Sequence, residues 1–419
     1  MNILITSASR QVTLVKEFKK ALKKVSPGRV IAADIDMNTP AIHFADDFRI
    51  TPKSADEQFI PFLLELCGEQ KIDLLVSSRD EELLVLAGHK EAFEEIGCKI
   101  MVADEQTIRI CYDKFLFCTF CEENSIPIPR TYTAYEEVKY PAFLKPRFGK
   151  GSKNTFKVNN QSELFSITRA FKDDFLVQQY IDWKEYTIDL FADFEGNVIS
   201  VLPRERIRTF GGESYVTKTF KNEILINESI KISEKLGLVG KNAIQCFFDG
   251  KYVKFIEVNA RYGGGANLGF RAGHCTPEYL VRLVSGEKLE PQIGNFEDGV
   301  TMLRYTSDIF VDNEKNIFSG DGVGKTYCID IDGTICTEDA PYEHAQPLQK
   351  TIDKVNELYE QGNKILLFTA RGCKSKTDWS SLTKKQLESW GVKYHQLIFD
   401  KPYADYYIDN KAIDVLDWV

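Results

Sequence analysis

Two apolar runs that end on carboxylates constrain the fold of this chain more strongly than any other feature. Residues 327–334 (YCIDIDGT) and 406–410 (YYIDN) are rich in β-favouring side chains and stop on acids. Such runs predict buried strands that deliver acids to one edge of a sheet. Asp330 and Asp332 from the first strand and Asp409 from the second suit a hard divalent cation, which prefers oxygen ligands. A single run of this kind could equally be a turn with solvated acids.

Two further elements lie between these runs and favour the site over the turn. Residues 364–372 (KILLFTARG) predict a strand followed by the hydroxyl of Thr369, and an ammonium follows at Lys401. In this order the four elements resemble phosphatases of the haloacid-dehalogenase (HAD) type, over the last quarter of the chain. The resemblance implies that Asp330 is the nucleophile and Asp332 the general acid/base. Thr369 would hydrogen-bond the phosphoryl oxygens, and Lys401 would neutralise their charge.

The same resemblance implies a Mg²⁺ site formed by Asp330, Asp332 and Asp409. Asn410 departs from the Asp-Asp pair of many relatives, and Asp414 would then supply the second acid. The span between the first strand and Thr369 is too short for a large cap domain. We therefore expect an open site for a bulky or partner-bound phosphorylated substrate.

Length and composition limit which kinds of protein this chain can be. A chain of 419 residues with 43% hydrophobic residues predicts more than one domain with a large core. The net charge of −9 and the lack of a long basic run argue against nucleic acid as a partner. Neither a leader segment nor an apolar run long enough for a bilayer is found. Ten cysteines are scattered, and Cys118 and Cys121 sit in an amphipathic stretch that favours buried helix thiols over zinc ligands. We expect a cytoplasmic protein with reduced thiols and no membrane partner.

Residues 1 to about 105 alternate between strand and helix patterns. This alternation predicts an open, mostly parallel, Rossmann-like sheet. Asp34 follows the second strand, where a ribose-binding acid could sit. The turn at residues 6–11 lacks the glycines of a dinucleotide fingerprint, so this signal for a ribose site is weak. We expect a scaffold that contributes part of a substrate site. The predicted strands are 3–6, 30–33, 74–77 and 99–102, and the predicted helices are 12–24, 55–67 and 81–95.

A loop rich in glycine and lysine follows a strand in the second block, which spans about 106–310. Asp113 and Lys114 begin a predicted helix, and residues 140–146 predict a strand that delivers Lys145. Residues 147–154 (RFGKGSKN) could fold over phosphates, because glycine allows close backbone approach and lysines neutralise charge. By itself this loop could equally be a solvated hairpin turn.

Two later strands place oxygen-bearing side chains two residues apart. Residues 242–248 and 252–261 predict a hairpin. Alternation puts Glu257, Asn259 and Arg261 on one face of the second strand, and Gln245 is available from the first. These oxygen ligands suit Mg²⁺, which takes its other ligands from water and nucleotide phosphates. The arginine could bind a transferring phosphoryl group.

Together with residues 175–189 (FLVQQYIDWKEYTID), these elements resemble the ATP-grasp enzymes, most closely the carbamoyl-phosphate-synthase-like branch. The resemblance spans about residues 1 to 305. It implies Mg²⁺ on Gln245, Glu257 and Asn259, and Arg261 on the transferring phosphate. Gln178 stands where many members have glutamate, and Gln245 replaces a common metal-binding acid. The implied ATP contacts are Lys114, Lys145, Gly149, Gly151, Ser152, Gln178, Gln179, Ile181 and Glu185.

The acceptor site is the least defined part of the pattern. Arg204, Arg206 and Arg208 alternate along a strand-like run and could bind a carboxylate or an acyl phosphate, or form one solvated face. Residues 320–326 (GDGVGKT) look like a Walker loop, but their glycines are too close and a strand follows, so this stretch predicts a linker.

The expected fold class is an α/β and α+β multidomain chain. It comprises a Rossmann-like pre-ATP-grasp domain (1–105), an ATP-grasp domain (106–310), a linker (311–325) and a Rossmannoid HAD-like domain without a large cap (326–419). The expected function is an ADP-forming ligase that joins a small-molecule carboxylate to an amine using ATP and Mg²⁺, fused to a Mg²⁺-dependent phosphatase, in small-molecule or surface-sugar biosynthesis. A kinase that releases a phosphorylated product, or a non-catalytic nucleotide sensor, stays open, as does a homo-oligomer.

Overall fold

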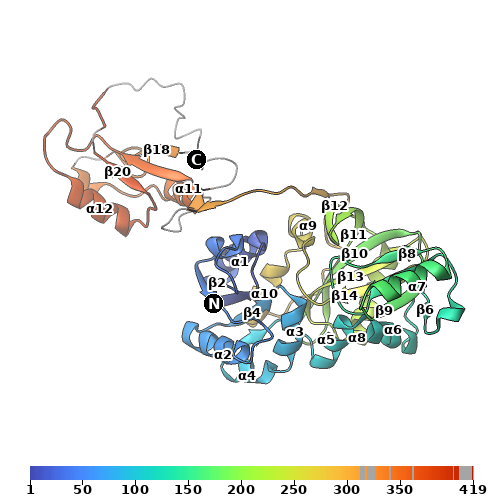
Figure 1. Ribbon diagram of the computed structural model, residues 1–419. Coiled ribbons are helices and arrows are strands. Elements are labelled where there is room, and N and C mark those ends of the chain that lie inside the picture. The colour runs from blue at the N-terminus through green and yellow to red at the C-terminus, as the bar shows by residue number, and fades with distance from the viewer. Residues whose placement is uncertain are drawn as a thin grey trace. The chain divides into compact units, whose positions relative to one another are not determined.

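The computed structural model describes residues 1–311, 317–318, 326–338, 341–360, 363–399, 401–404 and 418. The chain divides into two compact units, Met1–Tyr305 and Thr306–Val419 (Figure 1). Asp409, Asn410, Asp414 and most of the predicted linker lie outside the described residues. No helix in the described part of the chain has the length and apolar character needed to cross a bilayer.

A parallel five-stranded sheet opens the first unit, in the order β3-β2-β1-β4-β5. Its strands alternate between two cores, because successive side chains of a strand point to opposite faces. Ile3 and Ile5 pack with α1 and α10, whereas Leu4 packs with α2 and α3. The sheet is therefore covered on both faces, as the strand–helix alternation predicted. The strands are β1 (Asn2–Thr6), β2 (Arg29–Asp34), β3 (Asp47–Ile50), β4 (Leu74–Ser77) and β5 (Lys99–Ile100).

Four helices lie between these strands in the chain, and two more follow β5. Helix α1 buries Leu14, Val15 and Phe18 against the sheet. The N-terminus of α6 is capped by Asp113, whose side chain accepts hydrogen bonds from the backbone of Phe115 and Leu116. The helices are α1 (Val12–Val25), α2 (Phe59–Gln70), α3 (Asp80–Ala87), α4 (Lys90–Glu95) and α5 (Glu105–Tyr112), followed by α6 (Lys114–Glu123).

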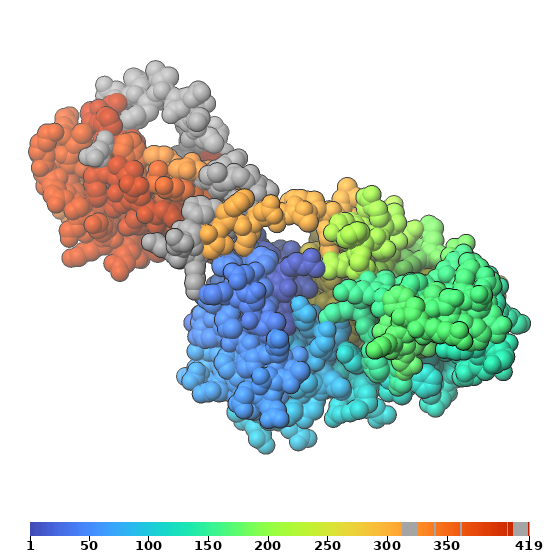
Figure 2. All heavy atoms as spheres, in the orientation of Figure 1, coloured from blue at the N-terminus to red at the C-terminus, as the bar shows by residue number. Residues whose placement is uncertain are grey.

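Two antiparallel sheets form the rest of the first unit. A four-stranded sheet, β6-β9-β7-β8, packs its core against α7 through Leu164. A six-stranded sheet, β14-β13-β10-β11-β12-β15, packs against α8 and α6. In Figure 2 these elements and the N-terminal sheet form one continuous body within residues 1–305. The strands are β6 (Thr131–Tyr132), β7 (Ala142–Pro146), β8 (Phe156–Val158), β9 (Phe175–Gln179), β10 (Lys184–Ala192), β11 (Val198–Phe210), β12 (Glu213–Thr219), β13 (Gly240–Phe248), β14 (Val253–Asn259) and β15 (Thr301–Leu303), and the helices are α7 (Gln161–Ala170), α8 (Glu223–Leu236), α9 (Ala266–Arg271) and α10 (Thr276–Val284).

In the described part of the second unit, β18, β19 and β20 form a parallel sheet in that order. Leu348, Ile352, Val355 and Leu358 recur at helical spacing ahead of Gly362 and predict a helix, and helix α11 buries the last three of them. The elements are β16 (Phe310–Val311), β17 (Ile317–Phe318), β18 (Thr326–Asp330), α11 (Gln349–Glu360), β19 (Lys364–Phe368), α12 (Ser380–Ser389) and β20 (Gln396–Ile398), and the chain has short 3₁₀ turns at Pro40–Phe44, Tyr135–Glu137 and Tyr342–His344.

The structure differs from the predicted elements in four places. The helix predicted over 81–95 is two helices, because the chain leaves helical geometry at His89. The helix predicted from residue 55 begins at Phe59, and strand β3 was not predicted. Arg261 does not share a strand face with Glu257, because β14 ends at Asn259 and the Arg261 backbone N–H turns back to donate to the Asn259 carbonyl.

Candidate functional site

Strands β13 and β14 bring the predicted metal ligands of the first unit together. Gln245 lies directly opposite Glu257 in the register, and Asn259 Nδ2 donates to Glu257 Oε1 at 3.4 Å. Among the described residues no group of three or more His, Cys, Asp or Glu side chains could hold a metal. One carboxylate and two amides are oxygen donors of the kind that Mg²⁺ accepts when nucleotide phosphates complete its shell. The residues present therefore fit Mg²⁺ bound together with a nucleotide.

Lys145 is a buried cation beside these ligands. It lies on β7, is 5% exposed, and its Nζ donates to the Ile256 carbonyl at 3.4 Å. In the described part of the chain it forms no ion pair. Burial lowers the pKa of the Lys145 ammonium, and the nearby charge of Glu257 acts in the opposite direction. A buried charge without a close partner is costly, so this site favours an anion.

The loop between β7 and β8 is held at its base by Arg147. The guanidinium of Arg147 makes hydrogen bonds of 2.6 to 3.0 Å to both oxygens of Asp113, the cap of α6. Lys114 Nζ donates to the Gly149 carbonyl at 2.8 Å. Gly149, Gly151 and Ser152 all have positive φ, which glycine adopts without strain. Three of the predicted ATP contacts, Gly149, Gly151 and Ser152, thus lie in one loop, with backbone that can approach a ligand closely.

The tip of this loop touches two other segments. A Cβ placed on Gly212 would lie 2.6 Å from Gly151 Cα, so the loop and the β11–β12 turn meet backbone to backbone. Lys150 Nζ lies 2.5 Å from Glu81 Oε1, at the start of α3. We call residues 147–155 the flap. Its contacts reach both the six-stranded sheet and the N-terminal sheet.

The predicted nucleotide-binding segment runs along β9 and into β10. Ile181 is buried, and Gln179 accepts a hydrogen bond from Lys254 at 2.9 Å. Gln178, expected near the adenine, is buried and its amide donates to Thr131 and Cys118. Burial raises the pKa of Glu185, and Arg206, whose Nε lies 2.8 Å from Glu185 Oε1, opposes this effect. Cys118 and Cys121 are buried and free in α6, as predicted.

The three arginines of β11 do not form one face. The register slips between Arg206 and Arg208, which breaks the expected alternation and leaves Arg208 exposed. Arg204 is buried, its Nε donating to Asp189 Oδ2 at 2.7 Å. Asp189 also accepts from the buried Lys241 at 2.6 Å, and the charges of these two cations outweigh burial and lower the pKa of its carboxyl. Arg204 and Lys241 thus share a single buried carboxylate.

Three ion pairs from the N-terminal sheet reach this region, and sequence reasoning missed them. They start from the turn after β1 and from the first two residues of α3, and join Arg10 to Glu213 (3.2 Å), Asp80 to Arg261 (2.6 Å) and Glu81 to Lys150 (2.5 Å). Arg304 was also missed, and it lies 2.5 Å from Glu213. The only sequence signal was that polar residues follow the strands at the sheet's carboxyl edge.

Asp330 ends β18 in the second unit, with the Lys401 ammonium paired to its Oδ2. Thr369 follows β19, the neighbouring parallel strand, and its Oγ1 lies 3.4 Å from Asp332 Oδ2. Four of the predicted residues are therefore together at one sheet edge. The fifth, Asp409, is outside the described residues.

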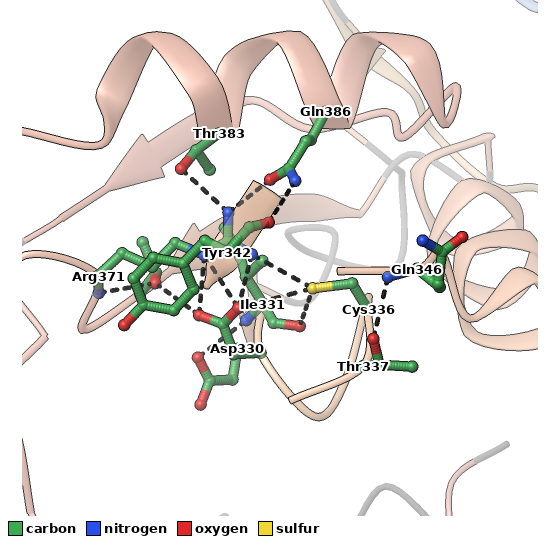
Figure 3. A network of polar contacts seen from close by, with 11 residues as sticks. Asp330, Ile331, Cys336, Thr337, Tyr342, Gln346, Arg371, Thr383 and Gln386 are labelled. Carbon is green, nitrogen blue, oxygen red and sulfur yellow. Dashed lines mark hydrogen bonds and ion pairs between the residues drawn. The ribbon is translucent and has the colours of Figure 1, made fainter. Parts of the chain in front are cut away.

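Arg371 organises this edge, a role that sequence reasoning did not assign (Figure 3). Its side chain is fully buried, and Nε and Nη2 donate to Asp332 at 2.6 to 3.0 Å. Nη1 donates to Thr383 and Gln386 of α12 at 3.2 and 2.7 Å, and the Tyr342 ring lies 4.7 Å from the guanidinium carbon. Arg371 thus fixes the orientation of Asp332. The sequence signal for Arg371 was its place in the run Thr-Ala-Arg-Gly (369–372), directly after a predicted strand.

Comparison with known families matches the first unit in two parts. Residues 3–101 match the PylC-like N-terminal domain, and residues 111–265 match the ATP-grasp domain. The matched ranges end at residue 265.

Curated relatives are similar over parts of the chain. The carbamoyl phosphate synthase large chain of Methanobrevibacter smithii is 31% identical over 222 residues, which is 46% of this chain and 21% of that protein. The D-alanine--D-alanine ligase of Petrotoga mobilis is 24% identical over 163 residues, 36% of this chain and 54% of that protein. The chain thus spans about a fifth of the length of the first relative.

Two solved structures share the fold. Biotin carboxylase from Campylobacter jejuni, in complex with β,γ-ATP, has a TM-score of 0.59 at 17% identity and covers 72% of this chain and 74% of its own. The biotin carboxylase domain of Hydrogenobacter thermophilus 2-oxoglutarate carboxylase, with MgADP and bicarbonate, has a TM-score of 0.59 at 18% identity and covers 72% and 73%. At these identities the likeness concerns the fold alone.

Proposed function

Because this chain has an ATP-grasp domain behind a PylC-like N-terminal domain, we propose that its first unit is an ADP-forming ligase. ATP-grasp enzymes bind ATP and Mg²⁺. In this chain ATP would phosphorylate a substrate carboxylate to an acyl phosphate with release of ADP. An amine would then attack the acyl carbon, release phosphate and leave an amide.

The observation that carries this proposal is the buried Lys145 without an acidic partner among the described residues. A nucleotide phosphate would supply the missing anion, and Lys114 donates a hydrogen bond to the flap at the Gly149 carbonyl. Glu257, Gln245 and Asn259 would hold Mg²⁺, which neutralises phosphate charge when bound. Arg261 would then bind the transferring phosphoryl group.

A screen of carboxylate and amine pairs for Mg²⁺-dependent ADP release tests the ligase. Glu257→Gln should lower ADP release by about a hundredfold, because an amide cannot neutralise metal charge. Glu297→Gln, in an exposed ion pair with Arg271, is the matched control. Near-normal ADP release from Glu257→Gln at saturating substrate would remove Glu257 as a metal ligand. Product analysis separates a ligase from a kinase that releases the phosphorylated acid, and a nucleotide sensor would release no ADP.

For the second unit we propose an aspartyl-phosphate phosphatase. The supporting observation is the Asp330–Lys401 pair at the carboxyl end of β18, where the cation would neutralise phosphate charge. Asp330 Oδ would attack phosphorus and expel the leaving-group oxygen, which takes a proton from Asp332. Water would then release phosphate from Asp330. Thr369 would hold a phosphoryl oxygen, and Asp330, Asp332 and Asp409 would hold Mg²⁺.

An aryl phosphate assay tests the phosphatase. Asp330→Asn should lose phosphate release by several orders of magnitude, because an amide cannot form the aspartyl phosphate. Asp353→Asn, on the surface of α11, should behave like the wild type. Activity of Asp330→Asn within about tenfold of wild type would exclude Asp330 as the nucleophile.

A further inference from the structure

A loop of three glycines lies between two arginines in the first unit. A Cβ on Gly265 would lie 2.4 Å from the guanidinium carbon of Arg204. On the next residue, a Cβ on Gly264 would lie 3.2 Å from Arg304 Nη1 and 3.4 Å from Glu213 Oε2. The glycines therefore leave room for the guanidinium groups and for a carboxylate against the loop.

Arg304 is held firmly in this position. Its Nη2 donates to the Gly264 carbonyl, its backbone N–H donates to the Tyr215 carbonyl at 2.8 Å, and its side chain is only 19% exposed. Below the loop, Arg204 shares Asp189 with Lys241, so two buried cations have one buried acid between them. This excess positive charge favours an anion at the loop.

Glu213 presents a carboxylate to this position. One of its oxygens lies 3.2 Å from Arg10 and the other 2.5 Å from Arg304, so each oxygen has its own guanidinium. Glu213 is 41% exposed and Arg10 is 81% exposed. The Arg10–Glu213 pair is exposed, and such pairs contribute little to stability, so a soluble carboxylate can take the place of Glu213 beside Arg10 at small cost.

The position of Arg10 points to a ligand site. Arg10 lies in the turn after β1. In the sheet order β3-β2-β1-β4-β5, the strands β2 and β4 pair with opposite edges of β1, so the strand order reverses at β1. Ligands of open parallel sheets bind at the carboxyl ends of the strands at such a point. Ser7 and Ser78 lie at the same edge, where Ser78 Oγ donates to the Ser7 carbonyl.

We propose that Arg10 and Arg304 bind a carboxylate group of the acceptor substrate and that Glu213 is the internal carboxylate which the substrate displaces. The inference rests on the proposed ligase and adds to it the residues that hold a carboxylate group of its acceptor substrate. Arg10 and Arg304 determine the specificity for this carboxylate. When no substrate is bound, Glu213 lies between the two arginines and forms an ion pair with each of them.

Succinate binding, measured by titration calorimetry at constant ionic strength with chloride as the balancing anion, tests the proposal. Glu213→Gln should bind succinate at least about fivefold more tightly than wild type, because the competing charge is removed. Arg10→Ala should bind it about fivefold more weakly, and Arg304→Gln should lose binding. Arg271→Ala, in the exposed pair with Glu297, is the control and should match the wild type.

Equal succinate affinity in wild type, Glu213→Gln and Arg10→Ala, or no binding by any of them, would overturn the proposal. Arg10 and Glu213 are exposed, so their variants report on binding even where Arg304→Gln fails to fold. MgATP binding is measured on the same proteins and should not change. Loss of MgATP binding in the wild type would refute the ligase, and the succinate comparison would still decide the role of Glu213.

Discussion

At the scale of single residues, the buried polar groups of the first unit divide into paired and unpaired sets. Arg204 and Lys241 each have an ion pair with Asp189, and Ser200 Oγ lies 2.7 Å from Nδ1 of the buried His274. Lys145, by contrast, has only a carbonyl partner among the residues that the structure describes. Paired groups stabilise the fold, whereas an unpaired buried cation costs stability and serves a ligand.

Replacing Lys145 with methionine should separate these two roles. We expect Lys145→Met to keep or slightly raise the melting temperature, because an apolar side chain of similar length replaces a desolvated ammonium. Its affinity for MgATP should fall by about a hundredfold, roughly 2.7 kcal/mol. Calorimetry and thermal denaturation measure both effects, with Lys139→Met on the surface as the control. Unchanged MgATP affinity would contradict the assignment of Lys145 to phosphate.

His274 should make the first unit less stable in mild acid. Burial, followed by the charge of Lys241, lowers the pKa of His274 from 6.5 to about 3. The unfolded chain therefore takes up the proton first, so this contribution is complete above about pH 6.5 and is lost as the pH falls towards about 3. Between pH 7.5 and 5.5 the free energy of unfolding should drop by about 1.4 kcal/mol through this group.

The variant His274→Asn cannot titrate in this range but can still bond Ser200. Urea denaturation at each pH compares the free energy of unfolding of His274→Asn with that of the wild type. Hydrogen exchange in peptides from β10 and β11 then compares the local stability of the two proteins. A pH dependence as steep in His274→Asn as in the wild type would show that another group is responsible.

At the scale of elements, the flap depends on a glycine outside it. Gly212 has φ +75° and no room for a Cβ, whereas Gly211 has φ +55° and open space around its Cβ position. Both alanine variants should therefore incur backbone strain, but only Gly212→Ala should push the flap away. Trypsin should cut after Lys150 and Lys153 several times faster in Gly212→Ala than in Gly211→Ala. Equal rates in the two variants would mean that the flap does not rest on this turn.

How far the sequence predicted the elements follows from the range of the interactions involved. The periods of β1, β4 and α11 are local patterns, so their bounds were found within a residue or two. The break at His89, the slip after Arg206 and the turn after Asn259 depend on tertiary contacts, which no local pattern contains. Glu257 and Lys145 stood in recognisable runs. Arg10, Glu213 and Arg304 are far apart in the chain, and only the fold brings them together.

At the scale of the whole molecule, the chain divides into two compact units, Met1–Tyr305 and Thr306–Val419. The proposed ligase residues all lie in the first, and the proposed phosphatase residues all lie in the second. Each activity should therefore survive the loss of the other.

We expect Glu257→Gln to retain aryl phosphate hydrolysis and Asp330→Asn to retain ADP release, each within about twofold of wild type. An equimolar mixture of the two full-length variants should show about half of each wild-type activity. The two assays run on the same samples measure this. Loss of both activities in either single variant would contradict independent sites.

The ion pairs Arg10–Glu213, Asp80–Arg261 and Lys150–Glu81 also imply a response to salt. At physiological ionic strength, charges in solvent are screened beyond about 8 Å, and buried pairs are screened much less. Arg10–Glu213 and Lys150–Glu81 are exposed enough to weaken as salt rises, whereas Asp80 and Arg261 are 18% and 16% exposed and should stay paired. Rising salt should therefore loosen the flap and free Arg10 from Glu213, while Arg304 and Arg261 keep their places.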